Sequence, residues 1–471
     1  MSDYELNKTI KRICDEFIDN HFEFTDNLRD VPVWSQAPDT LIQELLESKI
    51  PNEGRPLDEV YQQLQSEVYK YSLIGNHPRS FGFVPGVPTK LSFLGDMMTS
   101  AYNLHGSNWI NASAASTLES NMIRWLGSKI GYSEVSGGIF VSGGSMANLT
   151  GIVAGRDHSI PEDKRHLGIA YISDQTHHSV EKGLLIAGFT HNQIRKIASN
   201  ELFQIDVDAL QKSIVSDLEK GLIPGLIIAS AGTTNTGSVD NIQAISELAT
   251  KHNIWLHVDG AYGASFLLSN KHRHQLNGIE NADSVSWDAH KLLFQTYSCA
   301  MVLVKNKSSL LNSFSANPEY LDDIGGSTMD DFGSLGIELT RPTRALKLWL
   351  SLQVIGLDQF ERMIDGGHEL ALYTEKEVLN QEDWEIVSNP QFSILNFRYA
   401  NSKFDNESLN KINKQVANEI VDSGYAGVFT TQLKGKTVLR MCTINPNTTH
   451  EDIDNTLSRL NELAIHYAKL A

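Results

Sequence analysis

The sequence has 471 residues, about three to four times the commonest domain length, so a single small core is excluded and two or more lobes are expected. Apolar residues make up 41% and charged residues 20%, a composition that excludes disordered, collagen-like and disulfide-scaffold proteins. With 39 Lys and Arg against 57 Asp and Glu, the formal net charge of −18 argues against nonspecific binding to nucleic acid or to an anionic membrane.

The amino-terminal segment is expected to be helical. Its apolar residues Leu6, Ile10, Ile13 and Phe17 recur at spacings of four, three and four, the pattern of one helix face. The segment has no signal-peptide core, and no stretch approaches the roughly 18 apolar residues of a membrane span. Three widely separated cysteines suit a reducing compartment and offer no metal-ligand spacing. We therefore expect a cytoplasmic protein without a bound metal.

From about residue 130 to 305, short apolar runs alternate with helical patterns. This alternation is typical of βα units around a mostly parallel sheet. The apolar runs are residues 138–141, 226–229, 255–258 and 300–304.

Residues 312–336 are predicted to form an irregular loop, because their Asn, Pro, Gly and Ser residues disfavour regular structure. Long irregular loops inside compact domains tend to be lids or binding loops. Beyond about residue 348 the pattern indicates a smaller α/β lobe, with a strand at 392–397 and a hairpin near 434–436. A final helix is predicted after Thr448, whose spacing to Glu451 fits a capping box, with an inner face of Ile453, Leu457 and Leu460.

A loop of small residues, Ser142-Gly143-Gly144-Ser145, follows an apolar strand and leads into a helical pattern. Backbone N–H groups converge at a helix N-terminus and bind an anion there, usually phosphate. A plain structural turn is the alternative interpretation. The loop matches neither the Walker pattern nor the dinucleotide fingerprint, so a nucleotide is not expected.

Asp259 ends the apolar strand Trp255-Leu256-His257-Val258 and is followed by small residues. The carboxyl ends of parallel strands are where α/β proteins place ligands. An aspartate here could bind Mg²⁺, orient a base or hold a protonated nitrogen. A helix N-cap is the alternative.

Lys291 follows a short strand-like run, residues 284–288, and stands next to His290. Desolvation and neighbouring cations depress the pKa of a lysine, and a neutral amine can form a Schiff base. A phosphate loop, a strand-end aspartate and a strand-end lysine together describe a pyridoxal 5'-phosphate site. The loop would hold the phosphate, Asp259 the protonated pyridine nitrogen and Lys291 the aldehyde.

These ordered motifs resemble the group II pyridoxal-phosphate-dependent amino acid decarboxylases, which have the aspartate-aminotransferase-like fold (fold type I). The resemblance covers nearly the whole chain and is nearest to bacterial aromatic amino acid decarboxylases. It implies an α/β protein with a mostly parallel central sheet, and a homodimer. The implied parts are a dimer-forming helical segment (1–89), a large cofactor-binding domain (90–347) and a small C-terminal α/β domain (348–471).

The resemblance also implies roles for single residues. His177 would stack on the cofactor ring, and Thr234 would lie beside the ring and the substrate carboxylate. Tyr320, on the irregular loop, would protonate the carbon left when CO₂ departs; a phenylalanine is frequent there in relatives that form aldehydes. An ordinary loop histidine and a loop-anchoring tyrosine are the alternatives. The other implied cofactor contacts are Gly144, Ser145, His177, Asp259, Ala261, His290 and Lys291.

One position departs from the family pattern. Many members carry Asn-Pro before the His-Lys pair, whereas this chain has Asp288-Ala289. A carboxylate there would repel the phosphate unless it is turned away or hydrogen-bonded. Asp288 is therefore given no role.

The resemblance places the substrate side chain beside Phe81, Phe83, Val84 and Pro85. Two phenylalanines suit an aromatic substrate through stacking and burial, and ordinary core packing is the alternative. A glutamate decarboxylase would need a cation for the distal carboxylate, and Arg79 is the only basic residue of this segment. The other implied pocket positions are His105 and the partner subunit's Phe332 or Leu335.

The sequence thus predicts a decarboxylase that converts tryptophan, phenylalanine, tyrosine and their hydroxylated analogues into arylalkylamines and CO₂. One alternative is another reaction on the same cofactor, or decarboxylation of a non-aromatic amino acid. A second is a catalytically inactive binding protein, which the presence of every residue that the chemistry requires disfavours.

Overall fold

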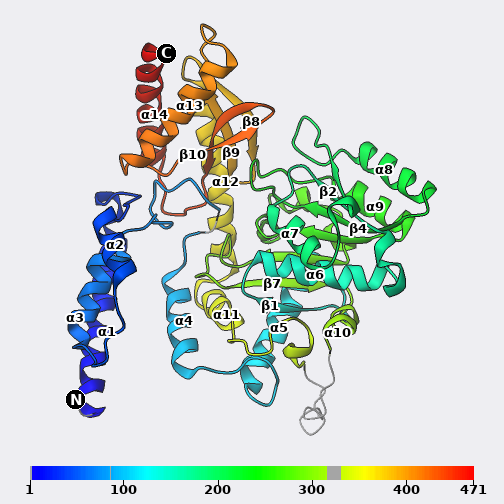
Figure 1. Ribbon diagram of the computed structural model, residues 1–471, viewed down its shortest axis with the longest axis horizontal. Coiled ribbons are helices and arrows are strands. Elements are labelled where there is room, and N and C mark those ends of the chain that lie inside the picture. The colour runs from blue at the N-terminus through cyan, green and yellow to red at the C-terminus, as the bar shows by residue number, and fades with distance from the viewer. Residues whose placement is uncertain (1–2, 85, 316–329) are drawn as a thin grey trace.

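A computed structural model describes residues 3–84, 86–315 and 330–471. Figure 1 shows a large α/β domain, a smaller α/β domain beside it and a group of N-terminal helices that stands apart from the large domain. Among the described residues, the large domain contains a seven-stranded sheet and the small domain a four-stranded sheet.

The large sheet has the strand order β1-β7-β6-β5-β4-β2-β3. Strand β7 runs antiparallel to both of its neighbours, and the other strand pairs are parallel, which confirms the predicted mostly parallel sheet. The strands are β1 (Gly137–Val141), β2 (Gly168–Ser173), β3 (Ile194–Ile197), β4 (Ile223–Ser230), β5 (Trp255–Asp259), β6 (Ser284–Asp288) and β7 (Ala300–Val304).

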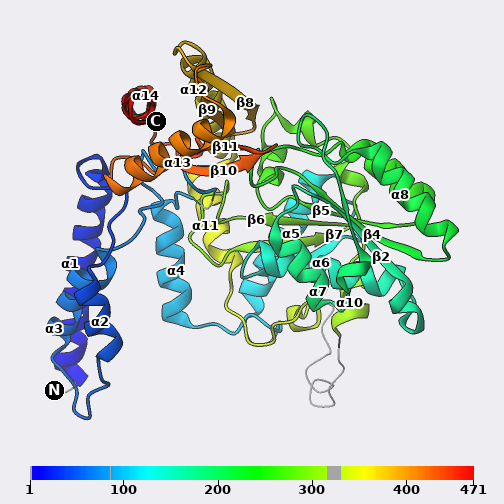
Figure 2. The ribbon, with the colours of Figure 1, turned by 45° about the horizontal axis from the view of Figure 1, so that its top comes forward.

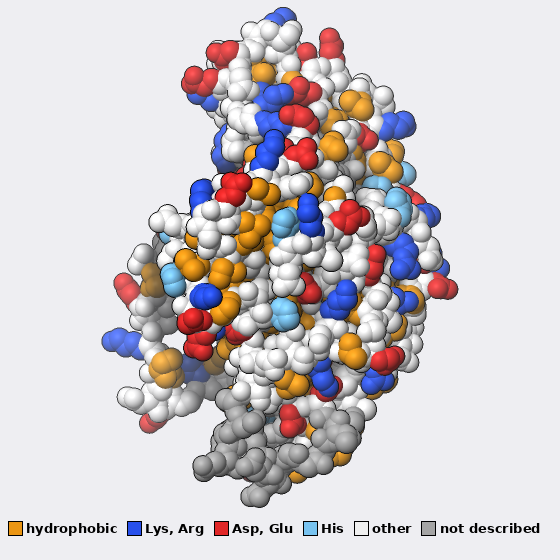
Figure 3. All heavy atoms as spheres, turned by 90° about the vertical axis from the view of Figure 1, so that its right-hand side faces the viewer, with side chains coloured by type: hydrophobic (Ala, Val, Ile, Leu, Met, Phe, Trp, Pro, Cys, Tyr) orange, Lys and Arg blue, Asp and Glu red, His pale blue; other side chains and the backbone are white. Residues whose placement is uncertain are grey.

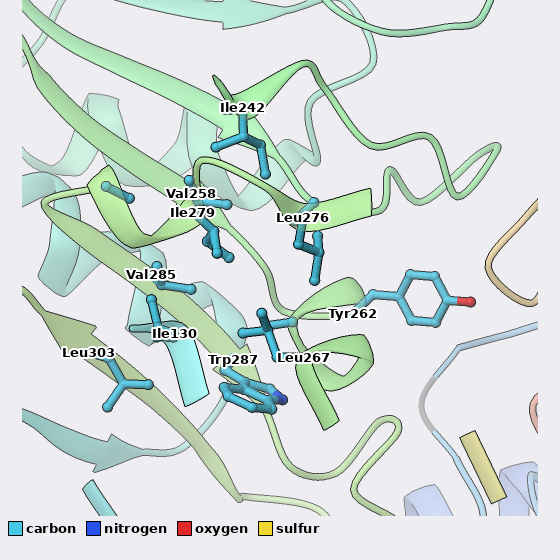
Figure 4. Packing of buried hydrophobic residues seen from close by; sticks show 14 of the residues in the cluster. Ile130, Ile242, Val258, Tyr262, Leu267, Leu276, Ile279, Val285, Trp287 and Leu303 are labelled. Atoms are coloured by element: carbon cyan, nitrogen blue, oxygen red, sulfur yellow. The ribbon is translucent and has the colours of Figure 1, made fainter. Parts of the chain in front are cut away.

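Helices cover both faces of this sheet (Figure 2). Successive side chains of a strand point to opposite faces, and in β4 Leu226 and Ile228 join one apolar cluster while Ile227 and Ala229 join the other. Figure 4 shows the second cluster, where Ile242 and Trp287 lie among other buried apolar residues. One face carries α5 (Ser113–Ile130), α8 (Val207–Glu219) and α9 (Ile242–His252), and the other carries α6 (Gly144–Ser159), α7 (His178–Ile186) and α10 (Ser308–Phe314).

The small domain contains an antiparallel sheet of order β10-β11-β9-β8. Its hairpin turns at Lys434 and Gly435, which both have positive φ (50° and 76°), as a two-residue turn between twisted strands requires. The hairpin was predicted at this position and is confirmed. The elements are α12 (Leu357–Leu379), β8 (Trp384–Gln391), β9 (Ile394–Tyr399), α13 (Asn406–Asp422), β10 (Phe429–Leu433), β11 (Lys436–Cys442) and α14 (His450–Leu470).

Two predicted boundaries in this domain shift. Strand β9 begins at Ile394, not Phe392, because Phe392 adopts a positive φ of 53° in the turn after β8. The last helix is capped by Thr449 and Asp452, one residue beyond the predicted capping box, and both capping hydrogen bonds form there. Its predicted inner face is confirmed, since Ile453, Leu457 and Leu460 are buried.

The N-terminal helices are α1 (Asp3–Asp26), α2 (Asp39–Glu47) and α3 (Leu57–Gln63), followed by a π-helical turn at Leu64–Tyr69. The predicted helix over Leu6 to Phe17 is confirmed, yet none of the residues of α1 is buried in the single chain. The elements α4 (Lys90–Tyr102) and α11 (Ala345–Ile355) pack against each other between this group and the large domain. Within the described ranges, no helix combines the length and the apolar character needed to cross a bilayer.

The predicted irregular loop is only partly described. Residues 312–314 belong to α10 instead, and Phe332–Ser334 form a single 3₁₀ turn. Residues 316–329, with Tyr320, lie outside the described residues, as does Pro85.

Surface charge is mixed on the face shown in Figure 3. There, acidic and basic side chains are interspersed over the described part of the surface instead of gathering by sign.

Candidate active site

A cavity of about 810 Å³ opens at the carboxyl ends of the parallel strands, where ligands of α/β proteins bind. The three anchors predicted from sequence, Gly144, Asp259 and Lys291, all line it. The structure also brings to this cavity Ser145, His177, Thr234, Ala261, His290, Phe83 and Val84 from the predicted set.

The small-residue loop joins β1 to α6, as predicted. Helix α6 begins at Gly144, and the N–H groups of Gly144 and Ser145 have no acceptor inside the helix, whereas those of Met146 and Ala147 donate to the Gly143 backbone oxygen. A Cβ atom on Gly144 would lie 2.7 Å from Asp288 Oδ2, so only glycine fits between the loop and β6. The result is an open cluster of donors at the positive end of a 16-residue helix, which suits a phosphate.

Asp259 ends β5 with its carboxylate almost fully buried (8% exposed). Its Oδ2 accepts from Asn148 Nδ2 at 3.0 Å, and its Oδ1 accepts from Ser286 Oγ and from the Ala261 backbone N–H, both at 3.2 Å. All three donors are neutral, and among the described residues no cation forms an ion pair with this carboxylate. A buried carboxylate of this kind is suited to a cationic group that enters from the cavity.

Lys291 follows β6, and its Nζ lies 3.2 Å from Asp288 Oδ2. His290 lies on the other side, with Nε2 3.5 Å from the same oxygen and Nδ1 2.9 Å from the backbone oxygen of Cys299. Burial lowers the pKa of His290. The His290 ring is therefore neutral at neutral pH, and Asp288 forms its ion pair with Lys291.

His177 precedes α7 and caps it, since its Nδ1 accepts from the Ser179 backbone N–H at 3.3 Å. Burial lowers the pKa of His177, which keeps its ring neutral at neutral pH. Thr234 and Ala261 reach the cavity from the segments that follow β4 and β5.

Several predicted pocket residues lie elsewhere. Phe81 is 1% exposed and packs in the core of the small domain. Its assignment to the substrate pocket is therefore wrong, and the alternative of ordinary core packing is correct. Phe332 and Leu335 are 1% and 2% exposed in the core of their own chain, which leaves neither side chain available to a partner's pocket. His105 lies near Asn111 and does not belong to the cavity lining of this chain.

Phe83 and Val84 remain at the cavity. The Phe83 side chain is 54% exposed and contacts the Phe429 ring at a centroid distance of 5.1 Å. Arg79 points elsewhere, because its guanidinium donates to the backbone oxygens of Arg29 and Tyr425.

Sequence reasoning missed Arg440, which lines the cavity from β11 of the small domain. Its Nη1 donates to the Gly82 backbone oxygen at 2.7 Å, while Nε and Nη2 are buried without a hydrogen-bond partner among the described residues. The available signal was an arginine inside the apolar run Val438-Leu439-Arg440-Met441. Asn148 and Tyr297 are further lining residues that were not singled out.

This fold and this cavity define a pyridoxal-dependent enzyme, and comparison with known proteins agrees. Residues 38–400 match the pyridoxal-dependent decarboxylase conserved domain, and the chain belongs to this family. It is 38% identical over 450 residues to an aromatic-L-amino-acid decarboxylase of Bacillus atrophaeus, covering 95% of this chain and 94% of that one.

Solved structures are similar over nearly the full length. The Oryza sativa TDC with PLP and tryptamine has a TM-score of 0.92 at 25% identity and covers 98% of both chains. The Catharanthus roseus tryptophan decarboxylase in complex with L-tryptophan has a TM-score of 0.90 at 27% identity and covers 99% of both chains. The predicted aspartate-aminotransferase-like fold is thereby confirmed.

The chain is therefore a pyridoxal-phosphate-dependent carboxy-lyase that acts on a small-molecule substrate. The residues at the cavity fit the cofactor: a glycine-lined helix N-terminus for its phosphate, a buried carboxylate paired only with neutral donors for its ring nitrogen, and a lysine amine for its aldehyde. When bound, the cofactor supplies the electron sink that decarboxylation requires.

Proposed function

We propose that this enzyme decarboxylates aromatic L-amino acids, namely tryptophan, phenylalanine, tyrosine and their hydroxylated analogues, and releases arylalkylamines. The observation that carries the substrate class is the apolar wall of the cavity, where the exposed Phe83 ring and Val84 lie on the same cavity as Lys291. An aromatic side chain gains free energy there by burial and ring contacts. Relatives and structural neighbours bear the names of decarboxylases of aromatic amino acids and tryptophan, which supports the same class.

The proposed roles of the site residues are supported by their positions at the cavity. Asp259 holds a proton on the cofactor ring nitrogen by charge attraction, because its other contacts are neutral. The backbone of Gly144 and Ser145 binds the phosphate, Lys291 is the point of covalent attachment, and His177 stacks on the ring. Tyr320, outside the described residues, stays the predicted proton donor.

Arg440 has a role that the sequence did not indicate. Its buried Nε and Nη2 atoms lack partners in the described structure, and its side chain reaches the cavity. Two unpaired N–H groups of a guanidinium match a carboxylate. We assign them to the α-carboxylate of the amino acid. The same unpaired N–H groups favour a second candidate substrate, an acidic amino acid whose distal carboxylate would bind to Arg440.

The deciding experiment is incubation of the purified enzyme with all twenty amino acids and identification of the amines by mass spectrometry. Aromatic substrates are expected to exceed glutamate by at least about a hundredfold in kcat/KM, since an unpaired carboxylate next to Phe83 costs several kcal/mol. Comparable rates with glutamate or aspartate would favour the second candidate. Arg440→Met should lower kcat/KM for every amino acid if Arg440 binds the α-carboxylate, and for acidic substrates alone if it binds a distal one.

We propose that the enzyme is a homodimer located in the cytoplasm. Each chain would consist of three parts, residues 1–89, 90–347 and 348–471. Its support is the exposed apolar surface of the N-terminal helices, where Ile10, Leu46 and Val68 are 43%, 73% and 43% exposed. Three free cysteines agree with a reducing compartment. Light scattering should give twice the 52.3 kDa chain mass, and the mass of one chain would exclude this assembly.

A further inference from the structure

A chain of buried hydrogen bonds leads from the large-domain core to the cavity. It begins at Trp255, whose indole N–H can only donate and does so to Ser284 Oγ at 3.0 Å. The Ser284 hydroxyl hydrogen is then available for His257 Nδ1, 2.8 Å away. Because a serine oxygen can also accept a second hydrogen, the position of the His257 ring hydrogen is decided by the contact on its Nε2 side. Burial lowers the pKa of His257 to about 4, so this ring is neutral at neutral pH.

Asn148 on α6 continues the chain. His257 Nε2–H donates to Asn148 Oδ1 at 3.0 Å, which leaves the amide N–H groups for Asp259 Oδ2 at 3.0 Å and Ser179 Oγ at 3.2 Å. The opposite amide orientation would set Oδ1 against the Asp259 carboxylate, two acceptors without a hydrogen between them. The acceptor-only Asp259 carboxylate thus fixes the amide, and the amide oxygen in turn places the hydrogen of the neutral His257 ring on Nε2.

Ser179 transmits this direction to His177. Because Ser179 Oγ accepts from Asn148, its hydrogen is available for His177 Nδ1 at 2.7 Å. The Ser179 backbone N–H donates to the same nitrogen at 3.3 Å. His177 Nδ1 is therefore an acceptor, and the hydrogen of the neutral ring is on Nε2.

The side chains of this chain of hydrogen bonds are shielded from bulk solvent. Trp255, Ser284, His257, Asn148 and Ser179 are at most 3% exposed. In such surroundings an unsatisfied donor or acceptor is costly, so the arrangement in which every group is paired is strongly favoured.

We propose that Asn148 is a positioning residue that orients the Asp259 carboxylate and, through Ser179, holds His177 as the Nε2–H tautomer. The two cavity residues are thus coupled by one amide, whose orientation is set by the Asp259 carboxylate and extends into the core through His257 and Ser284. This inference does not depend on which amino acid the enzyme decarboxylates.

The first test is ¹⁵N NMR of the holoenzyme labelled at histidine, with His177→Gln and His257→Gln used for assignment. Protonated and unprotonated imidazole nitrogens have well separated shifts. Both rings are expected to be neutral with Nδ1 unprotonated at pH 7.5. A hydrogen on Nδ1 of either ring overturns the proposal.

The second test breaks the chain at its start with Ser284→Ala, and a matched control exists in the same core. Ser265 is equally buried and also accepts from a tryptophan indole, Trp287 Nε1 at 2.9 Å, but lies outside the chain. Ser284→Ala should shift the Nδ1 signal of His257, which loses its hydrogen-bond donor, whereas Ser265→Ala should leave this signal unchanged. Identical spectra for the two variants contradict the proposed coupling.

Asn148→Asp keeps the side-chain shape and removes both donors. The dissociation constant of the cofactor, measured by absorbance on the holoenzyme, should rise by about 10- to 100-fold, since hydrogen bonds to a charged group are lost. Ser265→Ala should stay within about twofold of wild type. An Asn148→Asp variant with wild-type affinity and an unchanged His177 signal would overturn the proposal. If Asn148→Asp does not fold, Ser284→Ala alone decides.

Discussion

Asp288 places a buried carboxylate between Lys291 and the N-terminus of α6. Its Oδ2 lies 3.2 Å from Lys291 Nζ, and its Oδ1 has no hydrogen-bond partner within the described residues. The ion pair offsets part of the cost of burying this charge. The same carboxylate lies beside the loop assigned to phosphate, where a second negative charge is unfavourable.

Asp288→Asn is therefore expected to bind the cofactor more tightly. Removal of one negative charge near the phosphate loop is worth about 1 to 2 kcal/mol, which is about 5- to 30-fold in Kd. Titration of the apoenzyme with cofactor, followed by absorbance, measures this change. Asp365→Asn is a suitable control, because Asp365 is also buried and pairs with a lysine, Lys271, and neither residue lines the cavity. Weaker binding by Asp288→Asn would show that Asp288 serves chiefly to hold Lys291.

Small residues on α6 bring the helix close to the sheet and so set the spacing of the site. A Cβ on Gly151 would lie 2.7 Å from the His257 ring, and one on Gly155 would lie 2.5 Å from Trp255. The helix thus rests directly on β5. Its N-terminus at Gly144 and the strand end at Asp259 are held at a fixed separation by the same contact.

The two glycines of the phosphate loop differ in what surrounds them, and this difference is testable. Gly144→Ala should destabilise the apoenzyme by about 1 to 3 kcal/mol, because the new Cβ would overlap the buried Asp288 carboxylate. Gly143→Ala should be nearly neutral, since its Cβ would meet only His290 Cε1 at 3.8 Å and its φ of 176° is extended. Thermal unfolding of both variants gives the comparison. Equal melting temperatures would contradict the tight packing of β6 on the loop.

Element patterns predicted the site better than residue types did. Gly144, Asp259 and Lys291 could be placed together from sequence because parallel strands end at one edge of a sheet. Phe81 was misplaced because an apolar residue type does not distinguish a cavity wall from the core beneath it. Arg440 was missed because the small-domain sheet brings it to the cavity from a strand far along the chain.

At the scale of the whole molecule, folding buries histidines in a neutral form. Burial lowers the pKa of His77 and His257 to about 4, and it also lowers the pKa of His21, His177, His272 and His290. Two carboxyl groups have the opposite effect, since burial raises the pKa of Asp240 to about 6 and also raises the pKa of Asp283. These six histidines outnumber the two carboxyl groups, so the folded chain takes up fewer protons than the unfolded chain in mild acid.

Stability should therefore fall in mild acid. A histidine whose pKa is about 6.5 when unfolded and about 4 when folded contributes fully above pH 6.5, and its contribution is lost as the pH falls toward 4. Each such group adds up to about 1.4 kcal/mol per pH unit to the slope of the unfolding free energy. Urea unfolding of the apoenzyme between pH 7.5 and 5, fitted at each pH, measures this slope.

His77 allows the contribution of one group to be isolated, because it is fully buried and its Nε2 has no partner in the described structure. His77→Gln should retain an acceptor for the Arg79 backbone N–H, which now donates to His77 Nδ1 at 2.9 Å, and should remove one titrating group. Its unfolding free energy should depend less steeply on pH than that of wild type, by up to about 1.4 kcal/mol per unit near pH 5. His466→Gln, at an exposed position of α14, should leave the wild-type slope unchanged. If His77→Gln and wild type have the same slope, protonation of buried His77 does not limit the acid stability of this enzyme.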